Sequence, residues 1–430
     1  MIWEVISYII IFYGLVFSIF LLITLSENEE KVLKSEEPKK YPKVSIIVPA
    51  YNEADNIANT IENLLKLDYP KDKLEIIVVD DGSKDNTYEI AKKYEKYGVK
   101  VFRKENGGKA SALNYGFLRS TGEIIVSLDA DSYPERNALK NLVKYFDDPE
   151  VMAVTPSVKV ENPKNFVQLL QYFEYAFSVT LRKIFGLLDA IYVTPGPFSA
   201  YRREFLERYG LFDENNITED LEMGLRIQKY GFKIRNAIDA VVYTKAPDTF
   251  KKLMRQRLRW YLGFIENIIN YRHLIGRPDN LGRIILPSAV FYAITPAILS
   301  LTLIVSYSMT FFDYSRIFFR DPSVVFLAPV FIPNFLLSLI PSIDMNLFGV
   351  VSIIGVCISS IFIIFGENLT RGDKKILLAL PIYFIIWGFL YGIFWLNAFL
   401  YKLFGRELRW GEKLRWRNSI INKLLHKNEV

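Results

Sequence analysis

Hydrophobic residues follow two different patterns along this chain. Nearly continuous apolar runs, of about the length that crosses a bilayer or part of one, occupy Ile2 to Leu25, Ile284 to Tyr307, Val324 to Ile340, Leu347 to Phe365 and Ile376 to Tyr401. Between the first two runs, short β-branched segments alternate with segments of helical spacing. The pattern predicts one N-terminal membrane helix, an α/β domain and about four C-terminal membrane helices, with the run at 324–340 short enough to be re-entrant.

The α/β segment extends from Lys43 to about Tyr243. Its expected strands are 44–49, 74–81, 99–103 and a central strand that begins at Gly122, and its expected helices are 57–67, 87–97 and 109–120. Strands that alternate with helices usually form a parallel sheet with helices covering it. The sequence therefore predicts a mostly parallel sheet.

Composition and charge add a membrane to this picture. The 430 residues are 51% hydrophobic, and the mean hydropathy of +0.15 is too high for a wholly soluble chain. The net charge of +6 lies mostly in clusters beside apolar runs, which indicates the positive-inside rule rather than nucleic-acid binding. We therefore expect an integral protein of the cell membrane, with the α/β domain and the basic tail after Tyr401 in the cytoplasm. Cys357 is the only cysteine, so a disulfide within the chain is excluded.

Carboxylates follow the expected strands at the point where each strand ends. Asp129 and Asp131 follow the central strand, Asp81 follows the second, and Glu53 follows the first, close to Pro49 and Tyr51. Ligands bind at the carboxyl ends of strands in open α/β sheets. Side chains two apart on an extended segment point the same way, so Asp129 and Asp131 can meet one hard cation. The alternative is a set of acidic, helix-capping turns.

Further polar segments carry weaker signals. Asn106-Gly107-Gly108-Lys109-Ala110 lacks the spacing of a P-loop, but its glycines let the backbone approach a ligand while Lys109 meets a phosphate. Glu219 and Asp220 precede a helical pattern that ends at Tyr230, where a capping role is the alternative. Residues 247–271 have amphipathic spacing around Gln256-Arg257-Leu258-Arg259-Trp260, and the alternative there is a membrane-surface helix. The aromatic-rich segment 166–188, with Arg182 and Lys183, is a second interfacial candidate.

Taken in order, these motifs resemble those of the family 2 glycosyltransferases with a GT-A (Rossmann-like) fold. They are most similar to the motifs of the membrane-embedded processive synthases of cellulose, chitin, hyaluronan and poly-N-acetylglucosamine. The resemblance extends from about Lys43 to Tyr271. It divides the chain into an N-terminal membrane helix (1–26), a GT-A domain (43–246), an interfacial amphipathic region (247–276), C-terminal membrane helices (284–401) and a basic tail (402–430).

The resemblance also implies a role for each polar residue. Asp220 would be the general base, and Asp131 with Asp129 would hold Mg²⁺ or Mn²⁺. The acceptor would contact Trp260, Glu219 and Gln256. The nucleotide sugar would contact Pro49, Tyr51, Glu53, Asp81, Lys109, Asp129, Arg257 and Arg259.

The expected function is processive, inverting transfer from a nucleotide donor, favoured to be a UDP-sugar, to a growing β-linked polysaccharide that leaves through the membrane helices. One alternative is non-processive transfer to a polyprenyl or dolichyl phosphate or another lipid acceptor. An inactive scaffold or export channel is a third reading, but it leaves Asp81, Asp131 and Asp220 without a purpose. The expected partners are a nucleotide sugar, a polysaccharide or lipid acceptor and the lipid bilayer.

Overall fold

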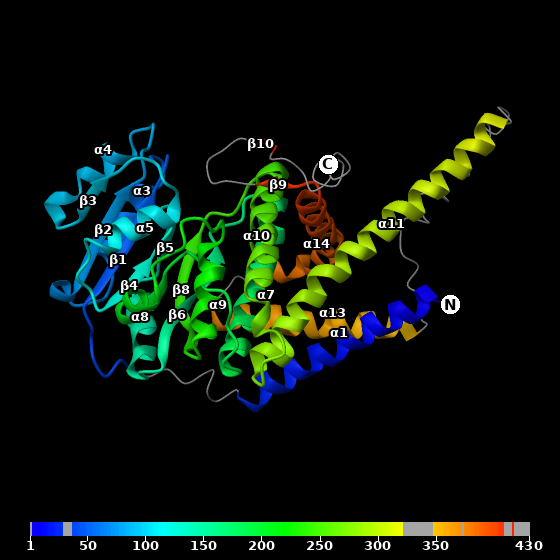
Figure 1. The fold of residues 1–430 in the computed structure, drawn as a ribbon, viewed down its shortest axis with the longest axis horizontal. Coiled ribbons are helices and arrows are strands. Elements are labelled where there is room, and N and C mark those ends of the chain that lie inside the picture. Colours follow the sequence, from blue (N-terminus) through cyan, green and yellow to red (C-terminus); the bar gives the residue numbers. More distant parts are fainter. Residues whose placement is uncertain (1, 29–36, 321–346, 371–373, 408–414, 417–430) are drawn as a thin grey trace, which may run out of the picture.

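A mixed sheet of eight strands forms the centre of the α/β domain. A computed structural model describes residues 2–28, 37–320, 347–370, 374–407 and 415–416 (Figure 1). The strand order in the sheet is β3-β2-β1-β4-β7-β6-β8-β5. The strands are β1 (Val44–Ala50), β2 (Leu74–Asp80), β3 (Lys100–Arg103), β4 (Ile124–Ser127), β5 (Ser132–Pro134), β6 (Val151–Val160), β7 (Ser199–Arg202) and β8 (Lys233–Thr244).

The sheet is less parallel than the sequence pattern predicted. β1, β2, β3 and β4 pair in parallel as expected, but β7 runs antiparallel to both β4 and β6, and β5 runs antiparallel to β8. A parallel neighbour requires a crossover that returns the chain to the same end of the sheet. β7 makes no such crossover, because it starts at Ser199 opposite Ser127, the last residue of β4. The expectation of a mostly parallel sheet therefore holds for β1 to β4, and β6 and β8 also pair in parallel, but it does not hold for β7 and β5.

Helices cover both faces of the sheet because side chains alternate along each strand. Ile46 and Val48 of β1 belong to one hydrophobic cluster, which includes residues of α3 and α6. Ile47 belongs to the other cluster, with residues of α5, α8 and α9. These helices are α3 (Ile57–Leu65), α5 (Lys109–Phe117), α6 (Ala138–Val143), α8 (Arg203–Tyr209) and α9 (Glu219–Lys229), and the short α4 (Thr87–Lys92) follows β2.

The apolar helices lie to one side of the domain, with α7 and α10 between them and the sheet (Figure 1). Within the described residues, three segments are long and apolar enough to cross a membrane: Tyr8–Glu27, Leu281–Met309 and Leu377–Leu403. The expected span at 324–340 and most of the tail at 402–430 fall outside the described residues. The helices are α1 (Ile2–Glu27), α7 (Phe166–Leu187), α10 (Phe250–Asn270), α11 (Leu286–Arg320), α13 (Leu347–Leu369) and α14 (Leu380–Leu403).

α13 and α1 approach the α/β domain with their C-terminal ends. Gly366 of α13 packs so closely on α7 that an added Cβ would lie 2.4 Å from the carbonyl oxygen of Ala176. At the end of the same helix, the carbonyl of Thr370 accepts a hydrogen bond of 3.2 Å from Lys159 of β6. Leu25, near the end of α1, lies in a cluster with Ile184 of α7. α7 therefore contacts α1 and α13, while α10 packs against α14.

Candidate active site

A cavity of about 900 Å³ opens at the carboxyl ends of β1, β2 and β4 and extends between α7, α10 and the apolar helices. The strand-end motifs, α9 and α10 each contribute side chains to it, although they are far apart in sequence. Except for Arg257, all the predicted site residues line this cavity: Pro49, Tyr51, Glu53, Asp81, Lys109, Asp129, Asp131, Glu219, Asp220, Gln256, Arg259 and Trp260.

Asp81 shapes the glycine-containing loop before α5. Its carboxylate accepts hydrogen bonds from the backbone N–H groups of Gly107 (3.0 Å) and Gly108 (2.8 Å) and from Lys104 Nζ (2.8 Å). Gly82 has φ = +73°, and a Cβ there would lie 3.0 Å from the backbone nitrogen of Asn106. Glycine is thus needed where the two loops meet. Asp81 reaches the cavity and also fixes the loop that carries Lys109.

The loops after β1 and β2 are joined by hydrogen bonds. The backbone N–H of Asn52 donates to Ser83 Oγ (2.9 Å), and its side-chain oxygen accepts from the N–H of Lys84 (2.8 Å). The N–H of Glu53 donates to Thr87 Oγ1 at the start of α4 (2.8 Å). These contacts hold the backbone directly after Tyr51 in place. The aromatic ring and the Glu53 carboxylate are therefore presented by a fixed loop.

Lys109 connects the two sides of the cavity. Its ammonium lies 2.5 Å from Asp129 Oδ1 and 3.2 Å from Glu219 Oε1. A Cβ at Gly196 would lie 2.3 Å from the same nitrogen, so glycine leaves the space that the lysine occupies. Burial alone would lower the pKa of Lys109, but Asp129, Glu219 and Asp220 together raise it. The lysine remains charged and compensates several carboxylates.

Asp131 lies among other carboxylates. Burial, followed by the charges of Asp129 and Glu53, raises its pKa to about 7. Within the described residues, no group of three or more His, Cys, Asp or Glu side chains is arranged to hold a metal by itself. A pair of carboxylates still suits Mg²⁺ or Mn²⁺, which bind through one or two carboxylates and complete their coordination with substrate phosphates. The excess negative charge at Asp131 fits such a cation.

Asp220 lies at the start of α9, facing α10. One of its carboxylate oxygens accepts a hydrogen bond from the backbone N–H of Leu221 (2.9 Å), and its backbone carbonyl accepts one from Thr194 Oγ1 (2.7 Å). Burial raises its pKa to about 6, and the charge of Glu219 adds to this, whereas Lys109 and Arg259 oppose it. A carboxylate of this pKa is ionised at neutral pH and is a stronger base than an ordinary aspartate.

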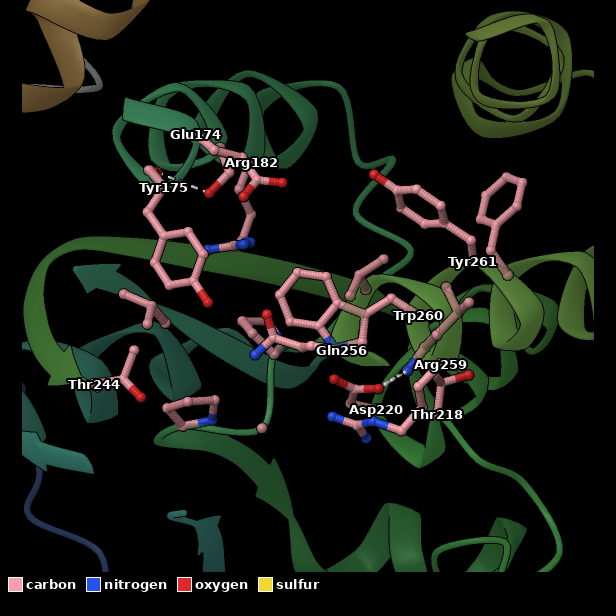
Figure 2. Close-up of a pocket in the computed structure, with 18 of the residues that line it drawn as sticks. Glu174, Tyr175, Arg182, Thr218, Asp220, Thr244, Gln256, Arg259, Trp260 and Tyr261 are labelled. Atoms are coloured by element: carbon pink, nitrogen blue, oxygen red, sulfur yellow. Dashed lines mark hydrogen bonds between the residues drawn. The ribbon is translucent and has the colours of Figure 1, made fainter. Parts of the chain in front are cut away.

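α10 is brought to Asp220 by close packing around Thr218. A Cβ at Gly263 would lie 2.2 Å from Thr218 Oγ1, so only glycine permits this approach. Asn267, one turn further along α10, donates to the same oxygen (3.0 Å). Figure 2 shows Arg259 and Trp260 of α10 beside Asp220, with Tyr175 and Arg182 of α7 approaching the same space. Sequence reasoning did not identify Gly263 or Asn267 as the residues that set this position.

Arg257 does not reach the cavity, which corrects its expected placement beside the donor diphosphate. Its side chain is fully buried (0% exposed) and is ion-paired with Glu174 of α7. Its guanidinium lies 4.1 Å from the ring centroid of Trp260 and 5.7 Å from that of Trp387 of α14. Residues three apart on a helix share a face, so Arg257 stacks on Trp260 while Arg259 points to Asp220. Arg257 therefore packs against Trp260 and connects α7, α10 and α14.

The sequence analysis also missed the residues that extend the cavity among the apolar helices. Glu174, Ser178 and Arg182 of α7 line this part of the cavity. They are four residues apart in the sequence, and this spacing predicts that their side chains lie on one face of a helix. α14 supplies a row of aromatic side chains, and Trp395 stacks on Tyr261 with ring centroids 4.1 Å apart. We call this part the aromatic chamber; it is lined by Tyr261, Tyr292, Phe362, Tyr383, Trp387, Tyr391 and Trp395.

Comparison with known proteins finds similarity to glycosyltransferases over part of the chain. Residues 45–210 match the family model described as glycosyl transferase family 2. A Bacillus subtilis protein named "Probable glycosyltransferase YdaM" is 35% identical over 237 residues, which are 53% of this chain and 56% of that protein. The poly-beta-1,6-N-acetyl-D-glucosamine synthase of Staphylococcus aureus (strain MSSA476) is 31% identical over 224 residues, which are 51% of this chain and 54% of the synthase. The chain thus matches about half the length of these relatives.

A solved structure supports the fold. The chain resembles a mannosyltransferase from Pyrobaculum calidifontis, solved in complex with GDP-Man and Mn²⁺, with a TM-score of 0.56 and 24% sequence identity. The alignment covers 84% of this chain and 99% of the mannosyltransferase. Together with the family match, this likeness confirms the predicted GT-A fold.

Proposed function

From the family 2 glycosyltransferase domain that the chain carries at residues 45–210, we propose that the protein transfers a sugar, with inversion, from a UDP-sugar to the growing end of a β-linked polysaccharide. Transfer is processive, and the polymer leaves through the protein's own membrane helices. The catalytic domain lies on the cytoplasmic side of the cell membrane, where nucleotide sugars are made.

The observation that carries this proposal is the single cavity that joins the strand-end carboxylates to the aromatic chamber. Asp220 and Trp260 both line this cavity and lie near each other (Figure 2). A donor held at the strand ends would place its reacting carbon near Asp220. An acceptor that extends into the chamber would place its terminal hydroxyl there too, and flat aromatic faces suit the apolar faces of sugar rings.

The chemistry follows from the charges around Asp220. The acceptor hydroxyl attacks the anomeric carbon, the bond from that carbon to the leaving phosphate oxygen breaks, and the hydroxyl proton passes to Asp220. Asp129 and Asp131 would hold Mg²⁺ or Mn²⁺, which when bound supplies positive charge beside the leaving diphosphate. Lys109 and Arg259 provide further positive charge on this chain.

The second candidate function is single transfer to a polyprenyl or dolichyl phosphate. One observation favours it: the cavity also reaches Phe17 and Leu21 of α1, so an isoprenoid chain would find apolar surface there. The two functions differ in their products. Incubating the purified protein in vesicles with a panel of UDP- and GDP-sugars, then extracting with organic solvent and sizing the aqueous fraction, separates a lipid-linked sugar from a polymer.

The pKa of Asp220 leads to a prediction about pH. Because this pKa is raised to about 6, the carboxylate is ionised above that pH and protonated below it. We expect kcat/KM for the donor to be constant from about pH 8 to pH 7, to be halved near pH 6 and to fall about tenfold per unit below about pH 5. The measurement is kcat/KM for the donor at saturating Mn²⁺, which reports the pKa of the protein before the donor binds, with nucleotide binding followed at the same pH as a control. A rate that stays constant down to about pH 5 would mean that the base has an ordinary aspartate pKa.

Trp260→Ala tests processivity. We expect this variant to make short products or none, because its ring contributes on the order of 1 kcal/mol or more of stacking to the acceptor. Hydrolysis of the donor by water should persist, since the donor side of the cavity is intact. The measurements are product length by gel filtration and nucleotide release. Tyr230→Ala, which removes an exposed ring at the far end of α9, is the control. Full-length polymer from Trp260→Ala would remove the reason to prefer a synthase.

A further inference from the structure

A second, smaller cavity lies where the first membrane helix meets the catalytic domain. Its volume is about 280 Å³, below the usual range for drug-sized ligands. α1 reaches it with Asn28, directly after its last turn, and α7 reaches it with its last two turns. The polar residues that line it are Asn28, Tyr145, Lys183, Asp189, Arg235 and Asn236.

Lys183 is the unusual residue of this cavity. It is 6% exposed, and its ammonium donates one long hydrogen bond, of 3.4 Å, to the backbone carbonyl of Asn236. In the part of the chain that the structure describes, it forms no ion pair. Burying a charge without a partner is costly. In agreement with this, burial lowers the pKa of Lys183 to about 8; the charge of Asp239 opposes this effect, and the neighbouring cations Lys144 and Arg235 add to it.

The carboxylates near Lys183 are already engaged. Asp239 pairs with Lys144 at 2.6 Å, and Asp189 pairs with Arg235. The cavity therefore holds two cationic side chains and one carboxylate. Among the residues that the structure describes, Lys183 has no carboxylate of its own, and its ammonium lies 5.7 Å from the ring centroid of Tyr145. Asn236, 2% exposed, also has a buried side-chain oxygen without a partner within the described residues. The site thus offers an ammonium to an anion and an oxygen acceptor to a hydroxyl.

The place of the cavity indicates where such an anion comes from. α1 exposes large apolar side chains such as Ile9 and Phe12, and its C-terminal end packs on α7 through Leu25. The end of a membrane-crossing helix lies at the level of lipid headgroups. Cationic pockets at this level on the cytoplasmic side suit phosphate headgroups.

We propose that the cavity around Lys183 and Arg235 binds the phosphate headgroup of an anionic lipid, with a headgroup hydroxyl on Asn236. The site is separate from the catalytic cavity, and the proposal does not depend on which sugar is transferred. It has a consequence for catalysis, because Arg182, the neighbour of Lys183 on α7, lines the catalytic cavity. A bound lipid holds α7 at the position from which Arg182, Tyr175 and Glu174 reach the acceptor side.

The test uses the full-length protein in nanodiscs of phosphatidylcholine alone or with phosphatidylglycerol. After transfer to neutral detergent, native mass spectrometry counts the lipids that stay bound. We expect the wild type to keep phosphatidylglycerol and not phosphatidylcholine. Lys183→Met should weaken this retention about fivefold or more, while Lys229→Met, at an exposed lysine on α9, should leave it unchanged. Equal retention of both lipids by the wild type, which needs no variant to fold, would overturn the proposal.

A second measurement separates a lipid from free phosphate. Inorganic phosphate is titrated into detergent-solubilised wild type, and thermal unfolding is followed. We expect phosphatidylglycerol to raise the unfolding temperature of the wild type more than that of Lys183→Met, and phosphate to have little effect at millimolar concentration. Stabilisation by phosphate with none from the lipid would assign the site to a soluble anion and overturn the lipid assignment.

Discussion

Replacing Asp220 with asparagine is expected to lower sugar transfer by about 10²-fold or more, while nucleotide affinity stays near that of the wild type. Asparagine keeps the shape of the side chain and its hydrogen bond from the N–H of Leu221, but it cannot accept the acceptor proton. Single-turnover transfer and calorimetric titration of UDP would measure the two effects separately.

Asp213→Asn is a matched control for this variant. It makes the same chemical change seven positions earlier in the chain, at a residue that does not line the cavity. We expect it to keep near-normal transfer. If Asp220→Asn instead lost UDP binding and Asp213→Asn did not, the carboxylate of Asp220 would belong to the donor site, and another group would have to act as the base.

Asp131→Asn is expected to remove the increase in nucleotide affinity that Mn²⁺ produces. The substitution leaves the cation one anionic ligand short, because Asp129 shares its charge with Lys109. Without metal, the variant should bind UDP at least as well as the wild type, since the negative charge of Asp131, whose pKa Asp129 and Glu53 raise, is gone. Titration of UDP with and without Mn²⁺ measures both effects. Equal Mn²⁺ dependence in variant and wild type would contradict the assignment of Asp131.

The strand-end residues of the site were predictable because their positions follow from local rules. The residues that follow parallel strands lie at the same edge of the sheet. Glu53, Asp81 and Asp131 are therefore close together, and this does not depend on the rest of the chain. β7 was not predictable in this way, because its direction depends on a connection without regular spacing. The fold could therefore be predicted for the parallel strands β1 to β4, and not for the antiparallel strands β7 and β5.

Arg257 and Arg259 show where local sequence stops being informative. Both are basic residues on one amphipathic helix, and nothing in their immediate neighbours distinguishes them. Their roles differ because Glu174, 83 positions earlier, and Trp387 of α14 surround only one of them. Tertiary partners at such separations have no sequence signal without a family of related sequences. The aromatic chamber was missed for the same reason.

The position of Lys109 would make the basicity of Asp220 depend on the donor. Without a donor, Lys109 pairs with Asp129 and Glu219, and its charge lowers the pKa of Asp220. A donor phosphate that attracts Lys109 would weaken this effect on the pKa, so Asp220 would become more basic when a sugar is bound for transfer. By reciprocity, deprotonating Asp220 would hold Lys109 back and weaken donor binding. Lys109 would thus couple proton abstraction by Asp220 to the presence of the donor.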